Sequence, residues 1–173
     1  MIEMDRSIET VTEMITQRGY KITENTTEHI IGSNLNAERI IAFKNNIIKF
    51  NIDKVKELIS VLFNIKINRC IVIYDDITTA TKKLINSLTE QDIELFTHEE
   101  LQYNITKHRL VPEHIRLDTK DAIDFKKKFG LKHATILRSE PISRFYNYNR
   151  GDIIKIIRVH DNIEYIAHRI VKG

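Results

Sequence analysis

A run of five apolar residues, Cys70–Tyr74, constrains the fold more than any other feature of the sequence. A strand with one solvent-exposed face alternates apolar and polar side chains, whereas a continuous apolar run is typical of a strand covered on both faces. Amphipathic helical patterns lie on either side of this run, at residues 55–62, preceded by Asp53, and at residues 77–88. These patterns predict an α/β region in which helices flank a mixed sheet.

The remainder of the first half fits the same class. Helical spacing from Met4 to Ile15 predicts a first helix, which Gly19 is placed to end in a left-handed conformation. Short strands are expected at residues 20–23, 39–43, 46–50 and 93–96, followed by a helical turn at residues 98–101. The second and third of these strands are expected to form a hairpin around Lys44 and Asn45, whereas the polar stretch through Asn36 has no clear periodicity.

The second half predicts a small α+β module. A strand at residues 114–117 precedes a helix that Asp118 or Thr119 caps, with three lysines in its last turn and Gly130 just beyond it. The helix carries Ala122, Ile123, Phe125 and Phe129. Residues 153–159 and 164–171 suit an antiparallel hairpin around Asp161 and Asn162. The change of pattern places a domain boundary near Asn104, giving domains 1–104 and 105–173.

Composition bounds the class of protein. A chain of 173 residues with 42% hydrophobic content can form a packed core. It contains neither an apolar run of the roughly 20 residues that span a bilayer nor the apolar region of a signal peptide, so we expect a soluble, intracellular protein without a membrane partner. The single cysteine, Cys70, excludes an internal disulfide framework, and its apolar surroundings indicate an inert thiol rather than a reactive one.

Charge is distributed unevenly between the halves. Residues 1–104 contain 12 basic and 16 acidic side chains, a net charge of −4, whereas residues 105–173 contain 15 basic and 8 acidic ones, a net charge of +7. A basic half directs attention to nucleic acid or to an acidic partner, although a solvated basic face explains it equally well.

The common catalytic patterns do not occur. The seven histidines lack the H-E-x-x-H register of a zinc protease, which indicates structural roles for them. A metal-dependent nuclease needs converging carboxylates beside a lysine, but no acidic residue of the first half is followed two positions later by Lys. Asp75 and Asp76 form a tight carboxylate pair at the end of an expected strand, and we expect Asp76 to cap a helix. The scattered glycines and serines build no phosphate loop or nucleophile elbow. Together with the histidine and carboxylate patterns, this means that neither a metal nor a cofactor is expected.

Three sequence blocks in the second half carry a family resemblance. They are L-V-P-E-H at Leu110–His114, E-P-I-S-R-F at Glu140–Phe145 and R-G-D-I-I-K-I-I-R at Arg150–Arg158, followed by Tyr165, Arg169 and Val171. Their order and spacing resemble the shared fifth subunit of eukaryotic-type DNA-directed RNA polymerases, whose C-terminal half is a separate small polypeptide in archaeal polymerases. R-G-Y at Arg18–Tyr20 and the segment 70–88 are weaker anchors. A short first half and a composition rich in Ile, Asn and Lys look like the version of a large DNA virus.

The resemblance implies a non-catalytic polymerase subunit. In that family the C-terminal module docks on the largest subunit, and the N-terminal domain forms part of the lower jaw around downstream duplex DNA. The docking candidates carried over by motif are Pro112, Glu113, His114, Pro141, Arg144, Phe145, Arg150, Gly151, Arg158, Tyr165 and Arg169. Pro112, Pro141 and Gly151 have structural roles as alternatives, whereas the guanidinium groups of Arg144, Arg158 and Arg169 suit an interface better.

The resemblance also gives a DNA-proximal segment. The DNA-proximal candidates are Thr78, Thr79, Lys82 and Lys83. Residues 78–81 stand where the family has a T-P-S-A turn beside DNA, although Thr79 replaces the proline, and the two lysines follow this turn. Without the resemblance, this stretch is an ordinary helix start whose amides could face a phosphate. The implied location is the nucleus, a viral factory in the cytoplasm, or a virion, depending on the host. The alternative function is a stand-alone nucleic-acid-binding or nuclease-like protein.

Overall fold

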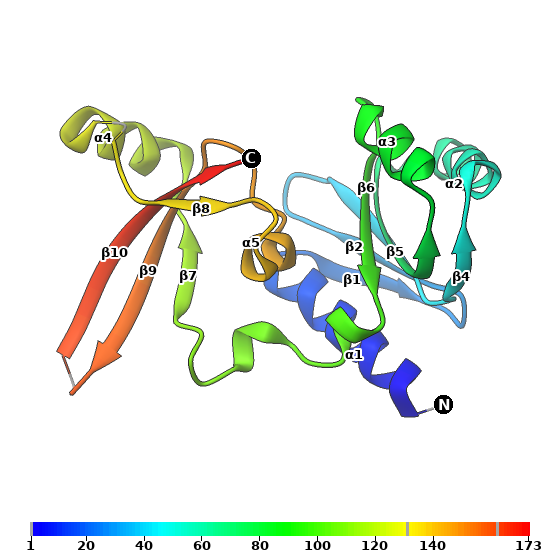
Figure 1. The fold of residues 1–173 in the computed structure, drawn as a ribbon, viewed down its shortest axis with the longest axis horizontal. Helices are drawn as coiled ribbons and strands as arrows, with labels where there is room; N and C mark the ends of the chain where they lie inside the picture. Colours follow the sequence, from blue (N-terminus) through cyan, green and yellow to red (C-terminus); the bar gives the residue numbers. More distant parts are fainter. Residues whose placement is uncertain (1, 131, 162) are drawn as a thin grey trace. The chain divides into compact units, whose positions relative to one another are not determined.

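The computed structural model describes residues 2–130, 132–161 and 163–173. The chain divides into two compact units, unit 1 (Met1–Tyr103) and unit 2 (Asn104–Gly173), one residue from the boundary expected from the sequence. Both units combine sheets with helices (Figure 1), so the fold is mixed α/β. No helix within the described residues is long and apolar enough to cross a membrane.

Unit 1 is built on one mixed sheet. In chain order its elements are α1 (Ile2–Gln17), β1 (Lys21–Asn25), β2 (His29–Ser33), β3 (Arg39–Phe43), β4 (Ile47–Phe50), α2 (Ile52–Ile65), β5 (Arg69–Ile77), α3 (Thr79–Ser87), β6 (Asp92–Thr97) and the 3-10 turn η1 (Glu99–Leu101). The first three strands are antiparallel, and β3, β4 and β6 all run parallel to β5. The longest strand, β5, is therefore the centre of the sheet.

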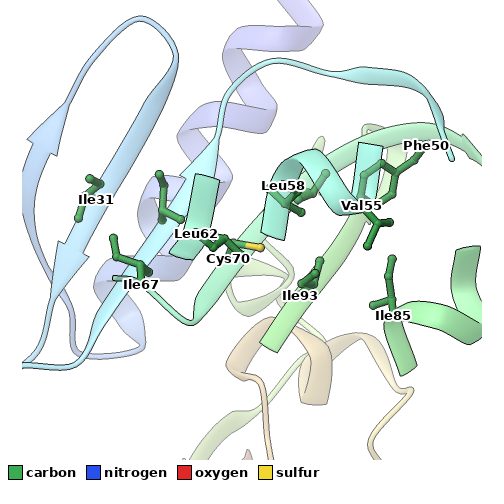
Figure 2. Close-up of a cluster of buried hydrophobic side chains, with 11 residues drawn as sticks. Ile31, Phe50, Val55, Leu58, Leu62, Ile67, Cys70, Ile85 and Ile93 are labelled. Carbon is green, nitrogen blue, oxygen red and sulfur yellow. The ribbon is translucent and has the colours of Figure 1, made fainter. Parts of the chain in front are cut away.

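Both faces of this sheet are covered, as the apolar run in β5 predicted. Cys70–Ile73 are all buried. One face packs against Leu58 and Leu62 of α2 and Ile85 of α3, and Figure 2 shows these side chains gathered around Cys70 and Ile93. The other face meets α1, because a Cβ atom added at Gly32 would lie 2.9 Å from Ile15 Cγ2. The sheet therefore lies between helices.

The R-G-Y motif fixes the end of α1. The backbone N–H of Tyr20 donates to the Ile15 carbonyl and that of Gly19 to the Thr16 carbonyl, while Gly19 has φ +87°. This is the Schellman arrangement, which satisfies the last carbonyls of a helix. Arg18 forms a buried, two-pronged ion pair with Glu94 of β6, with N–O distances of 2.8 and 2.7 Å. The motif thus ends the helix and fastens it to the sheet.

Two expectations for the first half were wrong. Strand β2 was missed because its apolar residues Ile30 and Ile31 lie within a polar stretch. The hairpin expected at Lys44 does not form, since β3 and β4 both pair with β5 and not with each other. The Lys44 backbone N–H donates to the Glu28 carbonyl at 2.8 Å, and its Nζ donates to Asn25 Oδ1 at 2.6 Å. The residue is therefore held by the β1–β2 turn.

Unit 2 is built on a smaller sheet. Its elements are η2 (Ile105–Lys107), β7 (Glu113–Arg116), α4 (Thr119–Phe129), β8 (Thr135–Leu137), α5 (Pro141–Tyr146), β9 (Ile153–His160) and β10 (Ile163–Lys172). The strand order is β7-β9-β10-β8, with only β8 parallel to its neighbour. The hairpin of β9 and β10 confirms the expected one; Asp161 has φ +51°, and Asn162 lies outside the described residues.

The two helices of unit 2 contact opposite faces of its sheet. Phe125 of α4 lies against His168, with ring centroids 4.6 Å apart. Ile142 of α5 packs in a core cluster with Ile154 and Val171. Since neighbouring residues of a strand point to opposite faces, His168 and Val171 mark the two sides. Strand β8 and helix α5 were not expected from the sequence.

The capping predictions had mixed outcomes. Asp118 caps α4 as expected, accepting from the Asp121 N–H at 2.8 Å, and Gly130 ends this helix at φ +76°. The prediction for Asp76 was wrong, because this residue belongs to β5 and Thr78 caps α3 instead. A hydroxyl directly before the first helical turn satisfies its free N–H groups, which a residue two positions earlier cannot do.

Candidate assembly site

A groove of about 290 Å³ opens on the α5 face of unit 2, and we call it the unit 2 groove. Its lining residues are Ile105, Leu110, Val111, Pro112, His114, Ile136, Glu140, Pro141, Ile142, Ile156, Arg158 and Arg169. These come from the segment before β7, from β7 itself, from α5 and the turn before it, and from strands β8, β9 and β10. Apolar walls with a few charged groups are typical of a binding site.

The groove brings together the three sequence blocks of the second half. Of the predicted docking residues, Pro112, His114, Pro141, Arg158 and Arg169 line it. The strand register explains how they meet. His114 of β7 lies opposite Ile156 of β9 in the ladder, which places its side chain on the same face as Arg158. Separate sequence motifs therefore form one surface.

Two guanidinium groups and one carboxylate supply the charge of the groove. The side chain of Arg158 is exposed and makes no hydrogen bond or ion pair with any part of the chain that the structure describes. Arg169 donates to the Thr135 carbonyl at 3.2 Å. Glu140 accepts from the Leu137 backbone N–H at 2.9 Å, so its carboxylate has a partner within the fold. The groove thus carries an excess of positive charge.

His114 is fixed in one tautomer. Its Nδ1 lies 2.7 Å from the Pro112 carbonyl oxygen, which can only accept, so Nδ1 carries the hydrogen. Burial lowers the pKa of His114; the Pro112 carbonyl and Glu140 oppose the shift, whereas Arg158 and Arg169 add to it. The neutral ring therefore keeps Nε2 as an acceptor.

The other docking candidates lie outside the groove. Glu113 pairs with Ile157 in the β7–β9 ladder and so points to the opposite face from His114. Arg144 and the buried Phe145 belong to α5. Tyr165 is half-exposed and lies opposite Arg158 in the β9–β10 ladder. Arg150 is exposed in the turn before β9. The predicted set therefore spreads over both faces and one end of the sheet.

The structural alternatives fit three of these residues. Pro141 is the first residue of α5, where its fixed φ suits a helix start and its missing N–H costs nothing. Gly151 has φ +89°, a conformation that L side chains rarely adopt, and its N–H donates to the Val171 carbonyl. Pro112 orients His114 through its carbonyl. Local structure alone accounts for these residue types, so a docking role for them needs other support.

Unit 2 also exposes many large apolar side chains, which sequence reasoning did not foresee. None of the described side chains of α4 is buried, although the helix carries Ala122, Ile123, Phe125 and Phe129. The exposed set comprises Leu110, Ile115, Ile123, Phe129, Leu137, Val159, Ile163, Tyr165 and Ile166. A concentration of this kind marks an interaction surface in a soluble protein. The sequence already contained a signal for this surface, because the second half has more large apolar residues than a sheet of this size can bury.

The predicted DNA-proximal residues lie at the start of α3. Thr78 Oγ1 accepts from the Thr81 backbone N–H at 3.2 Å, so its hydroxyl serves as a helix cap. Thr79, Lys82 and Lys83 are exposed. Asp75, near the end of β5, is exposed as well and adds negative charge close to this helix terminus.

Metal ligation and thiol reactivity can be compared directly with the described residues. No group of three or more His, Cys, Asp and Glu side chains among them could hold a metal ion. Burial raises the pKa of the Cys70 thiol far above its usual range, which confirms the expectation of an inert thiol.

Comparison with known proteins identifies the family. The RNA polymerase Rpb5 C-terminal domain family matches residues 103–171. Over 93% of both chains, the sequence is 26% identical to subunit rpabc1 of DNA-directed RNA polymerases I, II and III from Dictyostelium discoideum. It is 28% identical to RPABC1 of Caenorhabditis elegans, over 78% of this chain and 67% of that protein.

A viral protein is more similar over a shorter range. A proposed DNA-directed RNA polymerase subunit of Invertebrate iridescent virus 6 is 38% identical over 60% of this chain, which is 61% of the viral protein. The resemblance inferred from the three sequence blocks is therefore confirmed. Residues 103–171 belong to the Rpb5 C-terminal domain family, and nearly the whole chain is related to the shared subunit of DNA-directed RNA polymerases.

Proposed function

We propose that this chain is a non-catalytic subunit of a multisubunit DNA-directed RNA polymerase. Unit 2 is the assembly domain and docks on the largest subunit, and unit 1 forms part of the lower jaw near downstream DNA. The names of its relatives support the class of complex. The names also support an intracellular location. The compartment proposed is the nucleus, a viral factory in the cytoplasm or, for a packaged polymerase, the virion, according to the host.

The surface of unit 2 is the observation that carries this proposal. The part of the chain that matches the Rpb5 C-terminal domain is also the part with the groove and with the exposed apolar strands. An obligate subunit interface is rich in apolar area, whereas an independent monomer rarely leaves so much of it in water. Arginine is enriched at such interfaces, which suits Arg158 and Arg169.

A paired charge reversal tests the docking. Arg144→Glu with Arg158→Glu should abolish co-purification with the largest subunit. Charge pairs at interfaces are coupled by about 1.5–7 kcal/mol, so the loss should be at least tenfold. Lys21→Glu with Lys56→Glu makes the same change in net charge on exposed residues of unit 1 and is the matched control. Undiminished recovery of the Arg144 and Arg158 variant, with its fold confirmed by circular dichroism, would refute docking through this face.

Contact of unit 1 with DNA is proposed to be weak and confined to the assembled enzyme. Its net charge of −4 opposes binding to phosphate, and one helix start with two lysines offers few contacts. The assembly would hold the start of α3 beside the duplex and so raise its effective concentration.

The lifetime of the elongation complex measures that contact. Lys82→Ala with Lys83→Ala should shorten the lifetime slightly, more at low salt than at high salt, and should reduce the salt slope by no more than about two. The effect should be equal on two unrelated templates, because phosphate contacts carry no sequence information. An unchanged lifetime would remove the contact, and a template-specific loss would indicate base recognition instead.

A stand-alone nuclease is not proposed. Asp75 and Asp76 are exposed at the end of β5, and no described cluster of ligands around them could hold magnesium. Magnesium-dependent cleavage of DNA by the purified chain that disappeared with Asp75→Ala would reverse this conclusion.

A further inference from the structure

We propose that the unit 2 groove receives an extended, acidic peptide segment of the polymerase partner, with an apolar side chain between its walls and a carboxylate on Arg158 and Arg169. The inference rests on the proposed docking of unit 2 and names the chemistry of the segment that one part of the interface binds.

The walls of the groove select for an apolar side chain. Leu110 stands on the rim and is 74% exposed, while Pro112 and Pro141 contribute rigid rings without backbone donors. Ile142 and Ile156 are buried at the base. Covering this lining with an apolar side chain removes it from water, which is the main favourable contribution to association.

The charged groups of the groove select for a carboxylate. Arg158 makes no ion pair within the described chain, and Arg169 is held by a backbone carbonyl that leaves its positive charge uncompensated. The single acid, Glu140, already accepts a backbone hydrogen bond. A partner carboxylate between two guanidinium groups would form charge-assisted hydrogen bonds, which are about twice as strong as neutral ones. An acidic residue therefore complements the groove, and a basic one is repelled.

The fixed tautomer of His114 adds an acceptor. Because Nδ1 is engaged with the Pro112 carbonyl, Nε2 of the neutral ring can accept from a backbone N–H of the bound segment. An extended peptide presents such N–H groups along its length, whereas a helix uses them internally. This favours an extended occupant.

A nucleic-acid phosphate is the rival occupant for two arginines. The groove fits it less well, because prolines and isoleucines line it and the Glu140 carboxylate faces the same space. Single-stranded nucleic acid binds to basic grooves that carry aromatic stacking platforms, and no aromatic side chain other than the His114 ring is among the lining residues. The experiment separates the two occupants.

Photo-crosslinking from the rim identifies the occupant. Leu110 is replaced by p-benzoylphenylalanine in the full chain, the polymerase is assembled and irradiated, and the crosslinked product is sequenced by mass spectrometry. The expected product is a polymerase polypeptide segment with Asp or Glu beside an apolar residue. The same crosslinker at Leu137, exposed but outside the groove, should not yield that segment. A crosslink to nucleic acid, to a basic segment, or to nothing in a recovered polymerase overturns the inference.

A charge swap then tests the ion pair itself. Arg158→Glu should weaken recovery of the complex about tenfold or more, and Arg158→Lys should keep part of it. Reversing the crosslinked acidic residue to Arg should restore assembly with the Arg158→Glu chain, and failure to restore it contradicts the pairing.

Different results would contradict the proposed function and the proposed occupant of the groove. If the unmodified chain does not assemble with polymerase at all, the proposed function is wrong; if it assembles but the groove holds no acidic segment, only this inference is wrong.

Discussion

The two units of this chain treat their sheets in opposite ways. In unit 1 helices cover both faces, and β5 is buried over four consecutive residues, Cys70–Ile73. In unit 2 one helix packs on each face, yet the described side chains of α4 all stay at least partly exposed, and the β9–β10 hairpin leaves apolar residues in water. A sheet whose faces are covered by helices of its own chain can stay rigid without a partner. A sheet that leaves apolar side chains in water indicates a surface that a partner covers. The assignment of assembly to unit 2 rests on this difference.

A matched pair of Leu→Ala substitutions gives the largest expected contrast. Leu62 is 1% exposed in the core of unit 1, so Leu62→Ala should lower the free energy of unfolding by about 2–5 kcal/mol. Leu110→Ala, on the groove rim of unit 2, should change it by less than about 0.5 kcal/mol yet weaken co-purification with polymerase. Urea unfolding of the full chain, followed by circular dichroism, measures both. A comparable loss of stability at Leu110 would show that unit 2 buries this residue in its own fold.

A glycine in unit 1 tests how tightly its second face is packed. A Cβ atom at Gly32 would lie 2.9 Å from Ile15 Cγ2 and 3.0 Å from Tyr20 Cβ, so Gly32→Ala must shift these side chains or the backbone that carries them. We expect a loss of about 1–3 kcal/mol in stability. Ile15→Ala removes one clashing group and should cost less in the Gly32→Ala background than in the original chain. Additive effects of the two substitutions would contradict close contact between α1 and β2.

The free energy of unfolding of unit 2 should depend on pH through His114. Burial lowers the pKa of His114, so below about pH 6.5 the unfolded chain binds a proton that the folded one resists. Stability is therefore fully present above about pH 7.5 and falls as the pH drops through 6.5 towards the lower, folded pKa.

The His114→Gln chain should lose part of this slope in urea unfolding measured between about pH 7.5 and 5. His168, whose pKa is also lowered by burial, contributes in the same direction, but it is more exposed. His168→Gln is the matched control and should have the smaller effect. If the slope of unfolding free energy against pH were the same in the His114→Gln chain, the His114 ring of the original chain would have to be freely protonated in the folded state.

The smallest expected effect is a gain in stability. Ser143 of α5 is fully buried, and its Oγ has no hydrogen-bond partner in the described part of the chain. Ser143→Ala removes an unsatisfied polar group and improves helix propensity, so it should stabilise unit 2 by about 1 kcal/mol. If thermal and urea unfolding instead showed a loss above about 1 kcal/mol, the hydroxyl would have to have a partner in solution.

The sequence predicted local features well where neighbouring residues decide them. The helix end at Gly19, the Asp118 cap and the doubly covered strand β5 all follow from residue type and short-range pattern. The pairing of β3 and β4 could not be read in this way. Both strands have the apolar pattern of a hairpin, but their parallel pairing with β5, which is distant in the sequence, shows that the chain continues in one direction.

The candidate site was predictable in its members but not in its shape. The three blocks contain Pro112, His114, Pro141 and Arg158, and Arg169 follows them, yet nothing in their spacing along the chain indicates that one groove brings these residues together. Helix α5 was hidden in the E-P-I-S-R-F block because a six-residue helix is too short to show periodicity. The apolar residues of α4 did not reveal that none of them is buried, since a pattern cannot distinguish a face buried within the chain from one that a partner covers.

Hydrogen exchange of the free chain and of the assembled polymerase tests the central claim most directly. Assembly should slow amide exchange in unit 2, most strongly in β7 and in residues 158–159 and 163–166 of the β9–β10 hairpin, where the strands are exposed. The strands β2, β3 and β5 of unit 1, which already have runs of consecutive buried residues, should exchange at nearly the same rates in both states. Protection gained mainly in unit 1, with unit 2 unchanged, would contradict the claim that unit 2 is the assembly domain.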